Sequence, residues 1–157
     1  MCIRDRAKLA QRFQEESITW CVGASLLLYV KGIATDFHDI DIMVLEEDAL
    51  RVKDVLLRMG SQQPSHSNPR YQTTYFFEFI VAGVEIDVMG DFVIVKDGIA
   101  HDCALKKADI MEEVIVQNQR IPLHSLTLWK QYYTWMERKD KVCLLYTSSH
   151  RCLILRS

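Results

Sequence analysis

Two apolar segments of this sequence carry aspartates where a buried strand would ordinarily have none. Asp39 and Asp41 flank Ile40 in the run DFHDIDIMVL, and Asp87 lies in the run VAGVEIDVMG. Side chains two residues apart in a strand point to the same face, so the first two carboxylates lie side by side, about 7 Å apart at the backbone. Neighbouring like charges repel each other, and a bound cation is the usual compensation.

The aspartates also have a purely structural interpretation. Asp39 could cap a turn while Asp41 faces solvent, and Asp87 shares its strand face with Glu85, so it too could be exposed. Against this, a carboxylate inside an apolar strand costs free energy unless it has a partner. Oxygen ligands on rigid elements are what Mg²⁺ prefers when it also holds the phosphates of a substrate. The three residues together favour a metal-dependent phosphoryl or nucleotidyl transfer site.

The segment Gly23-Ala24-Ser25 lies between an expected strand and an expected helix. Glycine there allows a ligand to approach the backbone, and free N–H groups at a helix N-terminus attract anions. The Ser25 hydroxyl could reach a phosphate oxygen. Taken alone, a glycine at such a position is more often simply part of a turn.

The pattern of apolar residues predicts an α+β domain with a small mixed sheet and flanking helices. Residues 112–117 fit either a strand or part of a helix. We expect Leu50, Val52, Val55 and Leu56 to face inward from the third helix. The expected helices are 7–16, 24–30, 46–59 and a segment from 126; the expected strands are 18–22, 39–45, 71–81 and 84–90, with 92–95 continuing the sheet and 61–70 a loop.

Both ends of the chain resemble translations of one sequencing-library adapter, in its two orientations. These segments are MCIRDR at 1–6 and CLLYTS at 143–148. We therefore expect 1–6 and 143–157 to be adapter-derived and the native domain to span 7–142. Within that domain, we expect a catalytic core at 18–95 and a C-terminal helical part at 121–142.

Charge and cysteine content narrow the class of protein. Residues 7–142 hold 15 Lys and Arg against 20 Asp and Glu, a net charge of −5, which makes nucleic acid an unfavoured partner. The two cysteines of this range, Cys21 and Cys103, indicate neither a disulfide framework nor a zinc site, so we expect a cytoplasmic protein. No apolar run reaches the roughly 18 residues of a membrane span.

The segment WCVGASLLLYVKGIATDFHDIDIMV followed by VEIDVMG resembles the nucleotidyltransferase superfamily that includes DNA polymerase beta. It is most similar to the small bacterial branch of lincosamide-type antibiotic nucleotidyltransferases and toxin–antitoxin nucleotidyltransferases. Val22 and Gly23 fit the start of the superfamily pattern, and Asp39-Ile40-Asp41 and Asp87 fit its acidic residues. Ala24 departs from the usual glycine or serine, and the interval to Asp39 is slightly long.

This resemblance implies that Asp39, Asp41 and Asp87 are catalytic and hold two Mg²⁺ ions, and that Gly23, Ala24 and Ser25 bind the nucleotide. A nucleoside monophosphate would move from a nucleoside triphosphate, with ATP the first expectation, to an acceptor hydroxyl, with release of pyrophosphate. Asp87 is the first candidate for accepting the hydroxyl proton, and Glu78 and Glu85 are the reserves.

Two other functions remain open at this point. One is an antitoxin-like or regulatory subunit that acts by contact with a protein partner, and the other is a member that binds nucleotide without turnover. The first would keep its binding after loss of the aspartates. Intact aspartates at all three positions disfavour the second.

Overall fold

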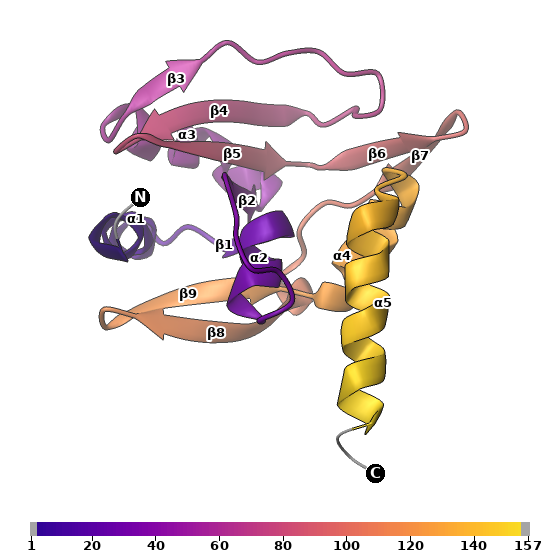
Figure 1. Cartoon of the computed structure of the whole chain (residues 1–157). Helices are drawn as coiled ribbons and strands as arrows, with labels where there is room; N and C mark the ends of the chain where they lie inside the picture. The colour runs from indigo at the N-terminus through magenta and orange to yellow at the C-terminus, as the bar shows by residue number, and fades with distance from the viewer. Residues whose placement is uncertain (1–2, 155–157) are drawn as a thin grey trace.

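The computed structural model describes residues 3–154 and is built on a seven-stranded mixed sheet (Figure 1). The strand order is β3-β4-β5-β2-β1-β9-β8, in which β2 pairs with β5 and β1 with β9 in parallel, and all other neighbours are antiparallel. The predicted α+β class is confirmed. The strands are β1 Trp20–Val22, β2 Ile40–Val44, β3 Ser61–Gln63, β4 Tyr75–Val81, β5 Val84–Gly90, β8 Ile110–Val116 and β9 Gln119–His124. A separate two-stranded sheet joins β6 Val93–Lys96 to β7 Ile99–Asp102.

The described residues form five α-helices around the sheet. In Figure 1, α4 and α5 lie side by side at one end of the molecule, away from α1 and α3. The helices are α1 Ile3–Glu15, α2 Ala24–Val30, α3 Ala49–Leu57, α4 Leu126–Trp135 and α5 Lys139–Ile154, with short 3₁₀ turns η1 Glu46–Asp48 and η2 Lys107–Asp109. Among the described residues, no helix is both long and apolar enough to cross a membrane. Helices α1 and α5 extend into the two adapter-like segments.

The two faces of the central strands have different surroundings. Val44 on β2 and Gly90 on β5 lie beside Ala49 of α3, because a Cβ added at Gly90 would be 3.0 Å from the Ala49 Cβ and 3.4 Å from Val44 Cγ2. Ile40 and Ile42 share the Val44 face and are buried. The intervening residue Asp41 therefore points to the opposite face, away from α3.

Several predicted elements are confirmed. The helix at 24–30 has the expected bounds, and the hairpin of β4 and β5 turns at Ala82-Gly83 as predicted. Of the segment that fitted either a strand or a helix, residues 112–116 lie in β8, which pairs with β9, and residue 117 begins the turn between them.

Other expectations were wrong. Residues 61–63 form β3 rather than loop, and 93–96 form β6 of the small sheet instead of extending the main one. Residues 121–124 belong to β9, where Ile121 and Leu123 are buried, so the C-terminal helices begin only at Leu126.

One expected core residue is exposed. Leu50 is 57% exposed, whereas Val52, Val55 and Leu56 are buried as predicted. The segment before Ala49 is a 3₁₀ turn, and the helix that follows turns Ala49, not Leu50, toward the sheet.

Candidate active site

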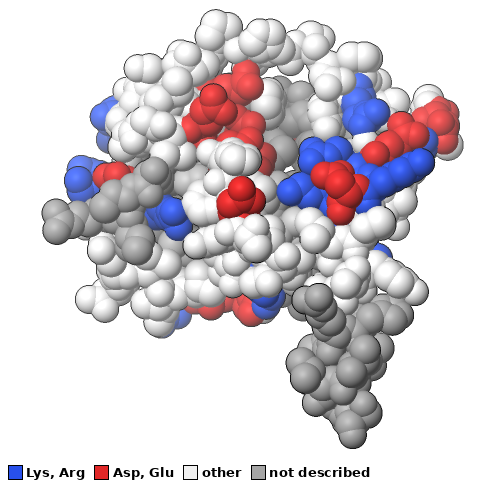
Figure 2. All heavy atoms as spheres, in the orientation of Figure 1, with Lys and Arg blue, Asp and Glu red and all other residues white. Residues whose placement is uncertain are grey.

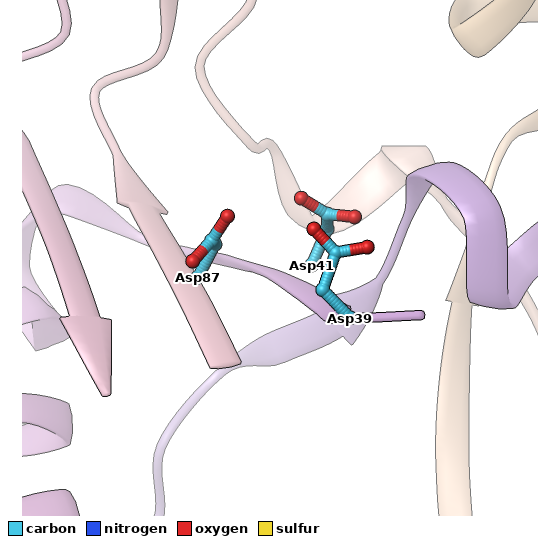
Figure 3. A group of neighbouring side chains, drawn as sticks. All are labelled: Asp39, Asp41 and Asp87. Atoms are coloured by element: carbon cyan, nitrogen blue, oxygen red, sulfur yellow. The ribbon is translucent and has the colours of Figure 1, made fainter. Parts of the chain in front are cut away.

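Three carboxylates meet where β2 and β5 run side by side. Asp41 on β2 lies directly opposite Asp87 on β5, and Asp39 immediately precedes β2. One carboxylate oxygen from each of the three residues lies within 4.8 Å of the other two. Figure 3 shows the three side chains directed into the same space. The alternation of side chains along the strand brings Asp39 and Asp41 together, and the parallel register adds Asp87 from 46 positions later in the sequence.

The electrostatics of this cluster favour a bound cation. Burial, followed by the charges of Asp39 and Asp87, raises the pKa of Asp41 well above its ordinary value. Burial, followed by the charges of Asp39, Glu78 and Glu85, raises the pKa of Asp87 to about 7. Asp41 and Asp87 are thus held in a setting where a negative charge is costly without a partner. Closely spaced oxygen donors of this kind fit Mg²⁺, which the three aspartates together could hold.

Glu78 adds a fourth carboxylate to the row. It lies opposite Asp87 in the antiparallel register of β4 and β5, so the two side chains share a face. Its Oε2 is buried and accepts no hydrogen bond from any described residue. Glu85 is exposed and does not line the cleft described below. Of the two reserve proton acceptors, only Glu78 therefore borders the space between the aspartates.

The Gly23-Ala24-Ser25 segment leads from β1 into α2. The Ser25 hydroxyl donates to Asp39 Oδ1 at 3.5 Å, which places Ser25 beside the carboxylate cluster. Ala24 has a left-handed backbone with φ of 46°, the region that favours glycine. The Ala24 position therefore carries backbone strain that a glycine would avoid.

Gly23 is required for packing against the C-terminal helices. A Cβ at Gly23 would lie 2.4 Å from Trp129 Cζ2, far inside van der Waals contact. Its N–H donates to the Asp41 carbonyl oxygen at 3.0 Å, which joins the end of β1 to β2. The close approach that this glycine allows is made by the indole ring of α4, and its amide already has a partner. Ala24 and Ser25, in contrast, face the cleft.

The carboxylates lie in a cleft with a volume of about 820 Å³. Its other walls come from the loop before β4 and from the C-terminal helices, which contribute Trp129 and Tyr133 of α4, followed by Arg138 and Lys141. Figure 2 shows acidic and basic side chains gathered near each other on the face around this hollow. The cleft is large enough for a nucleotide with part of an acceptor.

Two basic side chains between the Gly23-Ala24-Ser25 segment and the aspartates, Lys31 and His38, make no ion pair with the carboxylate cluster. The Lys31 ammonium is bonded to Glu112 and does not line the cleft. His38 does line the cleft, but its side chain is 91% exposed and its closest acidic neighbour is Asp36, at 3.9 Å. Arg138 and Lys141 were missed. Their spacing of three places them on one side of the chain, but only the packing of α4 and α5 brings that side to the aspartates.

Comparisons with known proteins agree with the interpretation of this cleft as a nucleotidyltransferase site. The family model of the aminoglycoside-2″-adenylyltransferases matches residues 7–143. A Thermotoga maritima protein provisionally assigned as a nucleotidyltransferase is 26% identical over 95% of this chain and 92% of its own, with a TM-score of 0.70. No curated protein sequence matches at a significant level.

Two antibiotic-modifying enzymes share the fold at lower identity. ANT(2″)-Ia in complex with adenylyl-2″-tobramycin is 11% identical, with a TM-score of 0.64 over 98% of this chain and 94% of its own. The lincosamide adenylyltransferase LnuA, bound to lincomycin, is 14% identical, with a TM-score of 0.60 over 91% of this chain and 95% of its own. The predicted superfamily and fold are thereby confirmed, and the chain belongs to the aminoglycoside-2″-adenylyltransferase family of nucleotidyltransferases.

Proposed function

We propose that this protein transfers AMP from ATP to a hydroxyl group of a small-molecule acceptor and releases pyrophosphate. The observation that carries the proposal is the meeting of Asp39, Asp41 and Asp87 in one cleft, with oxygens within 4.8 Å of one another. Family membership supports the adenylyl donor. Antibiotics are the first acceptors to test, because tobramycin and lincomycin accompany the similar structures.

The three aspartates would hold Mg²⁺, two ions in this proposal, at the edge of the nucleotide. When bound, the metal supplies charge neutralisation for the triphosphate and orientation for in-line attack on the α-phosphorus. The acceptor oxygen forms a bond to the α-phosphorus, the bond from that phosphorus to the bridging oxygen breaks, and pyrophosphate leaves with the electron pair. The hydroxyl proton would pass to a carboxylate oxygen of Asp87, which is the first candidate for the general base.

Ser25 would add a hydrogen bond to a phosphate oxygen, since its hydroxyl lies in the cleft and its bond to Asp39 is long at 3.5 Å. Ala24 lines the same space. Gly23 contributes indirectly, by letting Trp129 close the wall behind them.

The test is adenylyl transfer by the full chain with Mg²⁺ and ATP labelled at the α-phosphate. Aminoglycosides, lincosamides and an extract of small metabolites are offered as separate acceptor pools. The proposal expects a labelled product with the mass of one added adenylyl group and an equal amount of pyrophosphate. Binding of ATP without any product in all pools would favour a nucleotide-binding member without turnover. Absence of both binding and product would favour the partner-binding subunit.

A further inference from the structure

The charges that line the cleft are divided between its walls. Asp39, Asp41, Glu78 and Asp87 come from the sheet side. Among the described residues that line the cleft, Arg138 and Lys141 are the lysine and arginine side chains, and both come from the start of α5 and the turn before it. A nucleoside triphosphate brings about four negative charges into a space already rich in carboxylates. The two cations therefore favour a position in which its phosphates lie near α5.

Lys141 is a half-buried ammonium that the structure leaves unpaired. Within the described part of the chain, it makes no hydrogen bond or ion pair through its side chain. Its charge is near enough to Asp41 to oppose the rise in the pKa of that carboxyl. A cation held opposite the aspartates but not bonded to them is available to an anion that lies between the two walls.

Arg138 is held in place and still has a free donor edge. Its Nε and Nη2 donate to the two carboxylate oxygens of Asp140, each at 3.2 Å. Nη1 has no hydrogen-bond partner among the described residues. The Arg138 carbonyl oxygen accepts from the Lys141 N–H at 3.1 Å, so one turn of chain fixes the spacing of the two cations.

Other cations near this wall are already engaged or lie outside it. Arg70 and Lys96 both pair with Glu137, in the turn between α4 and α5. Lys139 is exposed and does not line the cleft. Glu137 thus holds the turn through two ion pairs, while Arg138 and Lys141 line the cleft.

We propose that Lys141, assisted by Arg138, binds the β- and γ-phosphates of the nucleotide and is a positioning residue for the transfer. This rests on the proposed function, because it requires a triphosphate to lie against the aspartates. The triphosphate then spans the cleft from the carboxylate cluster to α5. Recognition of the two outer phosphates makes the site prefer ATP over AMP, since AMP lacks the groups that Lys141 contacts.

The test compares Lys141→Met with Lys139→Met in the full chain. Methionine keeps most of the side-chain length but removes the charge, and Lys139 is the matched control on the same helix turn. Calorimetric titration with ATP, AMP and inorganic tripolyphosphate, each with Mg²⁺, gives the readout. Lys141→Met is expected to weaken the binding of ATP and of tripolyphosphate about 10- to 100-fold, because a lost charge-assisted hydrogen bond has that magnitude. The binding of AMP is expected to weaken less than about 2-fold. Lys139→Met is expected to match the parent chain.

The outcomes separate this inference from the proposed function. An unchanged ratio of ATP to AMP affinity in Lys141→Met, in a protein that unfolds at the parent Tm, overturns the role of Lys141 and leaves the transferase proposal standing. Binding of tripolyphosphate that depends on Lys141, with no binding of ATP, supports the anion site and contradicts the transferase proposal. No binding of either by the parent chain overturns both.

Discussion

Asp41 and Asp87 are direct neighbours across the parallel strands β2 and β5. The first belongs to the Asp-x-Asp segment, and the second lies on β5, after α3, β3 and β4. Parallel pairing gives each strand one fixed register, so their juxtaposition depends on the whole β2-to-β5 segment folding correctly. The tertiary structure therefore creates this carboxylate pair. The charged pair in turn costs free energy of folding, since burial raises the pKa of both groups.

Replacing Asp41 tests both the catalytic role of this pair and its cost in stability. Asp41→Asn keeps the side-chain shape but removes a charge from the cluster, so we expect adenylyl transfer to fall about 10²- to 10³-fold, in line with the loss of a group that stabilises charge at the reacting centre. The metal-free protein should unfold at the same Tm or higher, because a repulsive charge is gone. A rate within a few-fold of the parent in a labelled-ATP assay would exclude Asp41 from catalysis. A matched control is Asp54→Asn, on α3 outside the cleft.

The stability of the metal-free protein should depend on pH through Asp87. Its folded pKa of about 7 lies above the ordinary value of 3.8, so the folded state binds the proton more tightly than the unfolded state does. The resulting stabilisation is fully present below pH 4 and is lost as the pH rises toward 7. Between pH 5 and pH 8 we expect the free energy of unfolding to fall by roughly 1 to 3 kcal/mol from this group, after allowance for its partial exposure.

Denaturant unfolding at the two pH values, with chelator present, measures this change. Asp87→Asn should reduce the fall, and Mg²⁺ at pH 8 should restore stability to the parent chain but not to the variant. A free energy of unfolding that is flat or rising between pH 5 and pH 8 in the parent chain would contradict the assignment. The sign matters, because most carboxylates in folded proteins have the opposite effect on stability.

The contact of Gly23 with Trp129 predicts a large effect from one methyl group. In Gly23→Ala the new Cβ would meet the indole ring at 2.4 Å, so α4 must shift or the ring must change rotamer. We expect a loss of about 1 to 3 kcal/mol in the free energy of unfolding, the usual cost of overpacking.

A double-mutant cycle with Trp129→Leu identifies the cause. The smaller leucine side chain should tolerate the added methyl group at position 23, so the two changes together should cost less than the sum of each alone. Additive costs would show that the strain at this position has another origin. Gly83→Ala is a useful contrast, since no atom lies within 4 Å of a Cβ there and its cost would come from its φ of 77° alone.

Much of the fold and part of the site could be predicted from the sequence. Alternation in DIDIMV and VEIDVMG marks both central strands, and the spacing of Asp39 and Asp41 follows from strand geometry alone. Short or weakly patterned elements were missed for physical reasons. Ser61–Gln63 of β3 is polar and mostly exposed, and it is a strand only because β4 offers it an edge to pair with.

The pairing of distant groups lies beyond local pattern. Glu78 faces Asp87 because of the hairpin register, whereas its sequence neighbourhood is a run of aromatic residues. Arg138 and Lys141 read as ordinary charges at the start of a helix, and only the packing of that helix beside α4 turns them toward the aspartates. Gly23 is a further example. Its position in a turn is evident from the sequence, but the side chain that requires a glycine there is Trp129, far along the chain.

The measurement that tests the central claim most directly is thermal unfolding of the full chain with ATP, in the presence and absence of Mg²⁺, beside Asp39→Asn. A ligand at 100 times its dissociation constant adds about 2.7 kcal/mol of stability, enough for a clear rise in Tm. We predict that ATP raises the Tm only when Mg²⁺ is present and that Asp39→Asn abolishes the rise. A parent chain that melts cooperatively with no Mg²⁺-dependent shift, or a variant that retains the full shift, would contradict a metal–nucleotide site at these aspartates.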